Sequence, residues 1–267
     1  MTPLESLPIS TLRRIRCVFT DIDDTLTDFG QLTARTYQAI ESLANTGISV
    51  VPITGRPAGW CDLIARLWPV AGIVGENGAF YFRYDRSAKK MERYYVDSDS
   101  DRQAKRESLA MLGREILDQV PGAAISADQL YRETDLAIDF AEDVAPLSDE
   151  KINKIVALFH NRGATAKVSS IHVNGWFGDY DKLSMTRQYT QHCLGMSLDE
   201  EKSNFIFVGD SPNDAPMFGF FPNSVGVANV KHFIDHLKTP PKYVTHHPGG
   251  DGFSEVAAAL IATHRHD

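Results

Sequence analysis

Short apolar runs alternate with amphipathic stretches in the first part of the chain. Residues 15–20, IRCVFT, are mostly apolar, and residues 48–56, ISVVPITGR, form a second run that ends in a Thr-Gly turn. Between them, apolar positions recur at helical spacing over residues 33–46, and Gly47 is a typical helix terminator. The alternation continues with a predicted helix over residues 60–68 and a third strand and turn over residues 71–80. This order predicts βαβ units and a mainly parallel sheet.

The pattern changes in the middle of the chain and then returns. Two strands joined by a charged turn are predicted over residues 80–83 and 91–96, a half-buried strand over 135–141, and paired strands over 165–173. Helical patterns cover residues 102–119 and 149–161. From Lys182 onward, a helix to Gly195, strands over residues 204–210, 223–229 and 242–246, and a last helix over 253–263 restore the first pattern. The middle block is typical of an antiparallel sheet with helices on one face.

These two patterns predict one discontinuous unit with another inserted into it. We expect an α/β fold, in which a Rossmann-like core with a mainly parallel sheet carries an inserted α+β domain. The core would comprise residues 1–84 and 180–267, and the insertion residues 85–179. The architecture matters for function because ligands bind outside the carboxyl ends of the strands in an open parallel sheet.

Polar side chains follow each predicted core strand where the strand ends. They are Asp21 and Asp23 after the first strand, Thr54, Gly55 and Arg56 after the second, Glu76 and Asn77 after the third, and Asp210, Ser211, Asn213 and Asp214 after the strand over 204–210. Lys182 begins the helix that re-enters the core. We therefore expect carboxylates, a hydroxyl and a lysine to meet in one crevice.

This set of side chains suits phosphate chemistry with Mg²⁺. Crowded carboxylates repel one another unless they share a hard cation, and oxygen ligands suit Mg²⁺. The cation would neutralise phosphate oxygens, while Lys182 and Thr54 would hold the remaining ones. A carboxylate can also serve as a nucleophile and form an aspartyl-phosphate, and a second carboxyl group two residues away can act as acid and then as base.

Four motifs in this order resemble those of the haloacid dehalogenase (HAD) superfamily. DIDDTLT is similar to its Asp-x-Asp-x-Thr motif, ITGR to its Thr motif, Lys182 to its lysine motif, and GDSPND to its Gly-Asp-x-x-x-Asp motif. The GENGA turn and the insertion between the Thr and Lys motifs resemble the type IIB branch. That branch includes the Cof-type, sucrose-phosphate, trehalose-phosphate and mannosyl-3-phosphoglycerate phosphatases. The resemblance covers essentially the whole chain and implies a HAD core with a C2-type cap.

The resemblance also implies a role for each motif residue. Asp21 would be the nucleophile and a Mg²⁺ ligand, and Asp23 the general acid and base with its backbone carbonyl on the metal. Asp210 would complete the metal site, with Asp214 bound to the metal or lying behind it. The residues implied to contact the phosphoryl group are Thr54, Gly55, Lys182 and Asn213. Asp24 stands where many family members have glycine, and we expect it to point away from the metal and cap the following turn.

Several other side chains have both a structural and a functional interpretation. Arg56 is expected to hold its loop by an ion pair rather than to take part in catalysis. His172 and Asn174, in the segment that leads from the cap back to the core, are equally consistent with contacts to a sugar hydroxyl and with a sheet surface. The remaining candidates are Trp176, expected to pack at the hinge; Glu133 and Asp139, weaker cap candidates; the pair His246 and His247, expected in an exposed loop; and Asp251-Gly252, expected to cap the last helix.

Composition narrows the class of protein. The net charge is −8 and no long basic run occurs, so we do not expect a nucleic-acid partner. Three widely separated cysteines do not form a disulfide framework or a cysteine zinc site. The first 19 residues lack the apolar segment of a signal peptide, and no run reaches the ~18 apolar residues of a membrane span. We therefore expect a cytoplasmic protein without a membrane partner.

The function predicted from these observations is Mg²⁺-dependent phosphomonoester hydrolysis of a small phosphorylated metabolite. The branch implies a phosphorylated sugar or sugar derivative as the substrate, and a monomer or homodimer is expected. A phosphomutase-type phosphotransferase acting on hexose phosphates is the alternative, since phosphomannomutases share this architecture. A non-catalytic sugar-phosphate-binding protein is a further alternative, although no catalytic residue of the motifs is missing. A dehalogenase is disfavoured by Asp23, and a P-loop kinase by the absence of a G-x-x-x-x-G-K-[ST] sequence.

Overall fold

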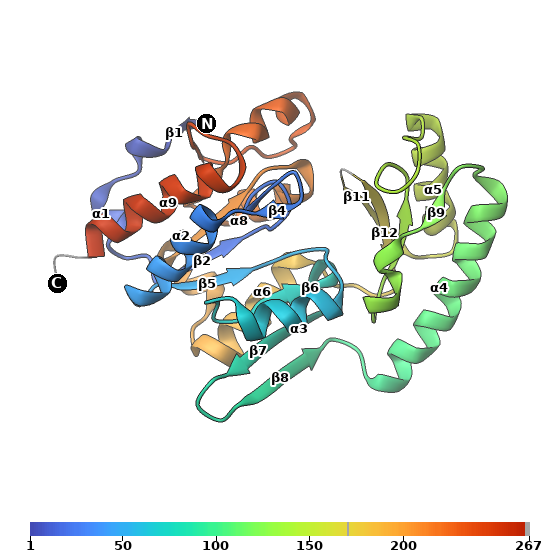
Figure 1. The fold of residues 1–267 in the computed structure, drawn as a ribbon, viewed down its shortest axis with the longest axis horizontal. Helices are drawn as coiled ribbons and strands as arrows, with labels where there is room; N and C mark the ends of the chain where they lie inside the picture. Colours follow the sequence, from blue (N-terminus) through green and yellow to red (C-terminus); the bar gives the residue numbers. More distant parts are fainter. Residues whose placement is uncertain (170, 265–267) are drawn as a thin grey trace.

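A six-stranded parallel sheet forms the centre of the larger lobe of the protein (Figure 1). The structure is a computed structural model that describes residues 1–169 and 171–264. The strand order is β1-β15-β14-β13-β2-β5, and every pair of neighbours is parallel. The strands are β1 (Thr2–Pro3), β2 (Cys17–Thr20), β5 (Ser49–Pro52), β13 (Phe205–Gly209), β14 (Ser224–Gly226) and β15 (Tyr243–Val244). The predicted α/β class with a mainly parallel core sheet is confirmed.

Helices cover both faces of this sheet because its strands present apolar side chains alternately to each face. Val18 of β2 belongs to one apolar cluster, whereas Cys17 and Phe19 belong to another. The first cluster includes side chains of α2 (Ala34–Asn45), α3 (Ala58–Leu67) and α9 (Gly249–His264), and the second those of α6 (Lys182–Tyr189) and α8 (Ala215–Phe220). Thr33 caps α2 by accepting a hydrogen bond from the backbone N–H of Thr36.

A three-stranded antiparallel sheet lies beside the main sheet on the core side (Figure 1). It consists of β6 (Ile73–Gly75), β7 (Phe80–Asp85) and β8 (Lys90–Tyr95), and a parallel bridge between Ile53 and Val74 connects it to the main sheet. The predicted boundary between residues 84 and 85 falls inside the β7–β8 hairpin. Met91 and Tyr95 of β8 pack against the first apolar cluster of the core. We therefore propose that the cap begins at α4.

The inserted cap forms the smaller lobe, with helices on one face of an antiparallel sheet, as predicted (Figure 1). The strand order is β11-β12-β10-β9. The elements are α4 (Asp99–Gln119), β9 (Ala124–Ile125), β10 (Leu136–Asp139), α5 (Asp149–Asn161), β11 (Thr165–Val168) and β12 (His172–Trp176). Ile116 and Phe159 of the helices pack against Ile138 and Val173 of the sheet in an apolar cluster separate from those of the core. Ser170, within the predicted paired strands, lies outside the described residues.

Short helices and a hairpin complete the described chain. They are η1 (Leu4–Ser6), α1 (Ile9–Leu12), the hairpin β3 (Thr27–Asp28) and β4 (Gln31–Leu32), η2 (Glu76–Gly78), η3 (Ala127–Tyr131), η4 (Thr190–Leu194), α7 (Leu198–Glu201), η5 (Lys202–Asn204), η6 (Pro212–Asp214) and η7 (Ala228–His236).

The prediction that Asp251-Gly252 caps the last helix is wrong. Gly252 N–H donates to the Pro248 carbonyl at 3.0 Å, so α9 already begins at Gly249.

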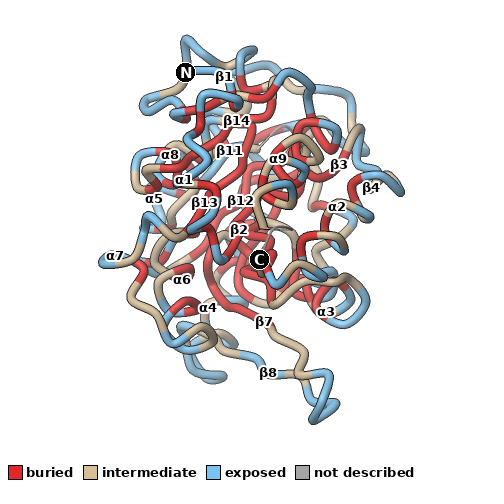
Figure 2. Tube along the Cα trace, turned by 90° about the vertical axis from the view of Figure 1, so that its left-hand side faces the viewer, coloured by how far each residue is buried: buried red, intermediate tan, exposed pale blue. Residues whose placement is uncertain are grey.

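The buried residues are concentrated in the three larger sheets. Figure 2 shows β2, β13, β7 and β12 largely as buried, and α7 and the far end of the β7–β8 hairpin as exposed. Neither lobe contains, within residues 1–169 and 171–264, a helix with the length and apolar composition needed to cross a bilayer.

Candidate active site

The carboxyl ends of two neighbouring parallel strands bring Asp21 and Asp210 together. β2 and β13 pair in register, Thr20 opposite Val208, so the residues that follow both strands lie at the same edge of the sheet. Lys182, at the start of α6, reaches the same edge. Its Nζ donates to Asp21 Oδ1 at 2.7 Å and to Asp214 Oδ1 at 3.0 Å. All four side chains are buried.

Three of these groups form a carboxylate cluster. One ligand oxygen each of Asp21, Asp210 and Asp214 lies within 4.8 Å of the others. Burial raises the pKa of Asp21 to about 7 although Lys182 opposes the shift, and burial together with Asp214 raises the pKa of Asp210 well above its usual value. One lysine thus balances three buried carboxylates. A set of hard oxygen donors with excess negative charge fits Mg²⁺.

The carboxylates of Asp210 and Asp214 differ in their hydrogen-bond donors and in their access to the cleft. Both oxygens of Asp214 accept hydrogen bonds, one from Lys182 and the other from the backbone N–H of Asp210 at 3.2 Å. Asp210 accepts from Thr25 Oγ1 at 3.3 Å and from Asn229 Nδ2 at 3.2 Å. Asp214 also does not line the cleft, whereas Asp21 and Asp210 do. Asp214 therefore lies behind the other two.

Asp23 is held by an arginine. Arg56 Nε donates to both Asp23 oxygens at 3.0 and 3.1 Å, and Nη2 donates to Oδ1 at 2.8 Å. The guanidinium also lies over the ring of Trp60, 4.5 Å from its centroid. The expected loop-holding ion pair of Arg56 is present, and its partner is the residue expected to be the general acid.

The Thr54–Arg56 loop is tied to its neighbours by its own polar atoms. Thr54 is fully buried, and its Oγ1 accepts from the backbone N–H of Arg56 at 3.0 Å. A Cβ on Gly55 would lie 3.2 Å from the side-chain amide of Asn77, so glycine suits this close approach. On the next loop, Asn213 lines the cleft and its Oδ1 accepts from Ser211 Oγ at 2.8 Å.

The cap and the core enclose a cleft of about 980 Å³ that contains this edge of the sheet. Its core side includes Asp21, Asp23, Gly55, Asp210 and Asn213. His172 and Asn174 of β12 line the cap side, so the structure brings both cap candidates into the same cleft as the motif residues. Asn174 Nδ2 donates to Asp135 Oδ2 at 3.1 Å. His172 Nε2 lies 2.8 Å from Glu142 Oε2, and burial lowers the pKa of His172.

The weaker cap candidates have structural contacts instead. Asp139 does not line the cleft, and its carboxylate accepts from the backbone N–H groups of Ala141, Glu142 and Asp143. Glu133 donates its backbone N–H to Glu76 at 2.9 Å. Asp139 therefore supports a loop of the cap, and the backbone of Glu133 contacts the core.

Two charged residues that the sequence did not single out join the cap to the core. Glu76 is fully buried, and its carboxylate accepts from the backbone N–H groups of Ala58, Glu133 and Thr134 and from the Thr134 hydroxyl. Arg132 of the cap donates from Nη1 to the Gly55 carbonyl at 3.0 Å. The sequence identifies Glu76 only as a strand-end residue. Nothing in the sequence around Glu76 indicates that it accepts a hydrogen bond from a residue 57 positions further along the chain.

A family model described as haloacid dehalogenase-like hydrolase matches residues 18–108, which carry the first two motifs. The chain has the haloacid dehalogenase-like fold. A comparison with curated proteins found no match. The family match and the fold together confirm the resemblance noted in the sequence.

Solved structures share this HAD-like fold over nearly the whole chain. A Thermoplasma acidophilum protein is 17% identical, with a TM-score of 0.71 over 92% of this chain and 98% of the other. A putative HAD/COF-like hydrolase from Plasmodium vivax is 18% identical, with a TM-score of 0.67 over 96% and 99%. The sucrose-phosphatase from Synechocystis sp. PCC6803, in complex with sucrose and phosphate, is 17% identical, with a TM-score of 0.62 over 93% and 98%. These likenesses show that the chain shares its fold with both hydrolases.

Asp24 departs from the HAD pattern in a way that the backbone explains. Its φ is +56°, in the left-handed region that favours glycine and that aspartate tolerates better than most residues. Asp24 is among the residues that line the cleft, beside Asp21 and Asp23. Burial, Asp23 and Asp28 raise its pKa. Its backbone N–H donates to Thr27 Oγ1, and no hydrogen bond to the Asp24 carboxylate occurs among the described residues.

Trp176, His246 and His247 have the structural surroundings that we expect from the sequence. Trp176 is buried and stacks on Tyr180, with ring centroids 5.9 Å apart. His246 and His247 lie in an exposed segment, and they pair with Glu5 and Glu255 rather than with each other. These three residues lie outside the cleft of the HAD-like core.

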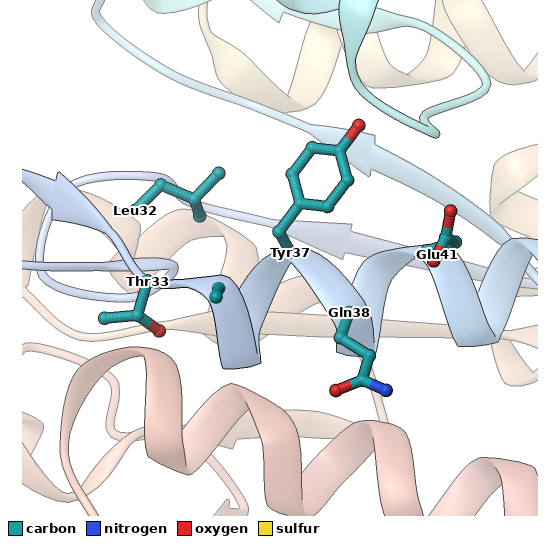
Figure 3. A pocket seen from close by; sticks show the side chains of 6 residues that line it. Leu32, Thr33, Tyr37, Gln38 and Glu41 are labelled. Carbon is teal, nitrogen blue, oxygen red and sulfur yellow. The ribbon is translucent and has the colours of Figure 1, made fainter.

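A second hollow, of about 600 Å³, lies along the surface of α2 (Figure 3). Tyr37 and Gln38 point to opposite sides of the helix, so their polar atoms do not converge. The Tyr37 hydroxyl donates to the Leu67 carbonyl at 3.0 Å. Glu41 is the hollow's one acidic side chain, and none of the motif residues lines it. The motif residues that line a hollow therefore lie in the cleft between core and cap.

Proposed function

We propose that this HAD-like protein is a Mg²⁺-dependent phosphomonoester hydrolase that acts through an aspartyl-phosphate on Asp21. The observation that carries this proposal is the position of the Asp21 carboxylate. It lies on the wall of the cleft, 2.7 Å from the Lys182 ammonium and within 4.8 Å of two further carboxylates. A carboxylate beside a fixed positive charge is suited to attack the phosphorus atom of a phosphate ester, because the positive charge attracts the negative phosphate oxygens.

The chemical steps follow from the residues around Asp21. An Asp21 oxygen forms a bond to phosphorus while the bond between phosphorus and the ester oxygen breaks, and Asp23 gives its proton to the leaving oxygen. Asp23 then takes a proton from water, whose oxygen attacks phosphorus and releases Asp21. Lys182 stabilises the negative charge on the phosphoryl oxygens, and Thr54, Gly55 and Asn213 orient the group.

The metal would be held by the carboxylates of Asp21 and Asp210 and by the backbone carbonyl of Asp23. When bound, Mg²⁺ neutralises charge on the phosphoryl group. Asp214, whose two oxygens are engaged by Lys182 and by the Asp210 backbone, would orient these groups from behind.

We propose a phosphorylated sugar or sugar derivative as the substrate. The cap side of the cleft presents His172 and Asn174, with Ser169, Lys167 and Glu142 nearby. Hydrogen-bond donors and acceptors together suit a leaving group that carries several hydroxyls. The sucrose-phosphatase with this fold, solved with sucrose and phosphate, supports the same class of ligand.

Release of inorganic phosphate from a panel of phosphorylated metabolites tests this function. We expect Mg²⁺-dependent release that is fastest with one or a few sugar phosphates, and no release by Asp21→Asn. A variant with substantial residual release, or a wild-type protein that interconverts sugar phosphate isomers without releasing phosphate, would reject the proposal.

A further inference from the structure

A series of alternating charges connects Asp23 in the core to the cap. Arg56 forms the bidentate contact with Asp23, and its Nη1 lies 3.9 Å from Asp128 Oδ2. Asp128, in η3 of the cap, accepts from Arg132 Nε at 2.9 Å and from Arg132 Nη2 at 3.0 Å. These four charged side chains, two from each lobe, therefore form a series in which each one contacts the next.

The cap end of this series is fixed in place. The Arg132 side chain is 1% exposed, and its Nη1 donates to both oxygens of Asp135 at 3.0 and 3.1 Å. The same nitrogen donates to the Gly55 carbonyl, one residue before Arg56. A buried guanidinium with this many acceptors cannot move without leaving buried acceptors unpaired.

The core end depends on one guanidinium. Among residues 1–169 and 171–264, the side-chain hydrogen bonds to the Asp23 carboxylate all come from Arg56. The Asp23 side chain is 37% exposed, so packing alone does not fix its direction. Arg56 is 12% exposed and is held by Asp128 on one side and by the Trp60 ring on another. The planar fork of an arginine orients a carboxylate in a way that a lysine does not.

We propose that Asp128 and Arg56 are positioning residues for Asp23, so that contact with the cap orients the proton donor toward the leaving oxygen. The proposal rests on the proposed phosphatase function. It assigns to a cap residue a part in the chemical step rather than in substrate selection. A loose Asp23 would matter most for esters whose leaving oxygen needs a proton.

Leaving-group dependence separates this role from a structural one. We would measure kcat/KM for phenyl phosphate, a poor leaving group, and for p-nitrophenyl phosphate, a good one, in wild type, Asp128→Asn and Arg56→Lys. This constant reports the steps up to transfer of the phosphoryl group to Asp21. Glu115→Gln, which removes the carboxylate from an exposed cap ion pair with Arg162, is the matched control.

We expect Asp128→Asn and Arg56→Lys to lower kcat/KM about tenfold or more for phenyl phosphate and less than about twofold for p-nitrophenyl phosphate. Glu115→Gln should change neither. Equal losses of kcat/KM with both esters would indicate general damage to the site. No loss with either ester would show that Asp128 and Arg56 do not affect Asp23. Each of these results would overturn the proposal. Wild-type protein that releases phosphate neither from these esters nor from any sugar phosphate would instead reject the phosphatase function.

Discussion

The Nζ atom of Lys182 lies 2.7 Å from Asp21 Oδ1, and the two side chains are only 8% and 7% exposed. The same ammonium contacts Asp214, whose side chain is fully buried. Because burial favours the neutral form of a carboxyl group, this lysine is what opposes protonation of the proposed nucleophile.

Lys182→Met should therefore lower both activity and stability. It leaves two buried carboxylates without their counter-charge and removes a stabiliser of the phosphoryl group, so we expect kcat/KM to fall at least about a hundredfold. Steady-state kinetics and urea denaturation measure the two effects. Lys154→Met, on the exposed face of α5, should change neither; a Lys182→Met protein with normal kinetics would contradict this role.

Metal removal tests the carboxylate cluster. We expect a chelator to abolish turnover and added Mg²⁺ to restore it. Mg²⁺ at about a hundred times its Kd should also raise the free energy of unfolding of the wild type by about 2.7 kcal/mol. Asp210→Asn should need at least about tenfold more Mg²⁺ for the same stabilisation, whereas Asp118→Asn, exposed on α4, should behave like wild type. Turnover that survives chelation would exclude a role for the metal in hydrolysis.

Substitution of Arg132 tests how much its buried ion pair contributes to stability. Its side chain is 1% exposed and faces the fully buried carboxylate of Asp135. Arg132→Met leaves that charge unpaired, and we expect the free energy of unfolding to fall by about 3 to 5 kcal/mol. Arg162→Met breaks an exposed pair and should cost less than about 1 kcal/mol. Denaturant titrations with equal losses for both variants would contradict the importance of the buried contact.

Glu76 should make stability depend on pH. Burial, with the Asp135 charge, raises its pKa from 4.5 to about 7. A carboxyl group whose pKa is higher in the folded state stabilises the fold most below its unfolded pKa, and this contribution is lost as the pH rises through the folded value. The free energy of unfolding of wild type minus that of Glu76→Gln should therefore fall by roughly 3 kcal/mol between pH 4.5 and 7.

Urea titrations at several pH values measure this difference. Glu107→Gln, exposed on α4, provides the control and should show no such trend. A wild-type-minus-variant difference that is constant over this range, or that rises with pH, would show that Glu76 does not titrate as described.

The sequence predicted the elements of both lobes and the meeting of Asp21, Asp210 and Lys182. These predictions depend on local periodicity and on one rule, that parallel strands end at the same edge of a sheet. The partners of Arg132 and Glu76 could not be predicted in this way, because they depend on how the cap sits on the core. The left-handed backbone conformation of Asp24 is likewise not revealed by the residue type alone.

Detection of a phosphorylated Asp21 tests the central claim most directly. Asp23→Asn, which lacks the base needed to activate water, would be mixed with p-nitrophenyl phosphate and Mg²⁺, quenched in acid, digested and examined by mass spectrometry. The account predicts a phosphoryl group on Asp21 in the peptide that contains residues 17–30. Release of p-nitrophenol with no phosphopeptide, or with the phosphoryl group on another side chain, would contradict it.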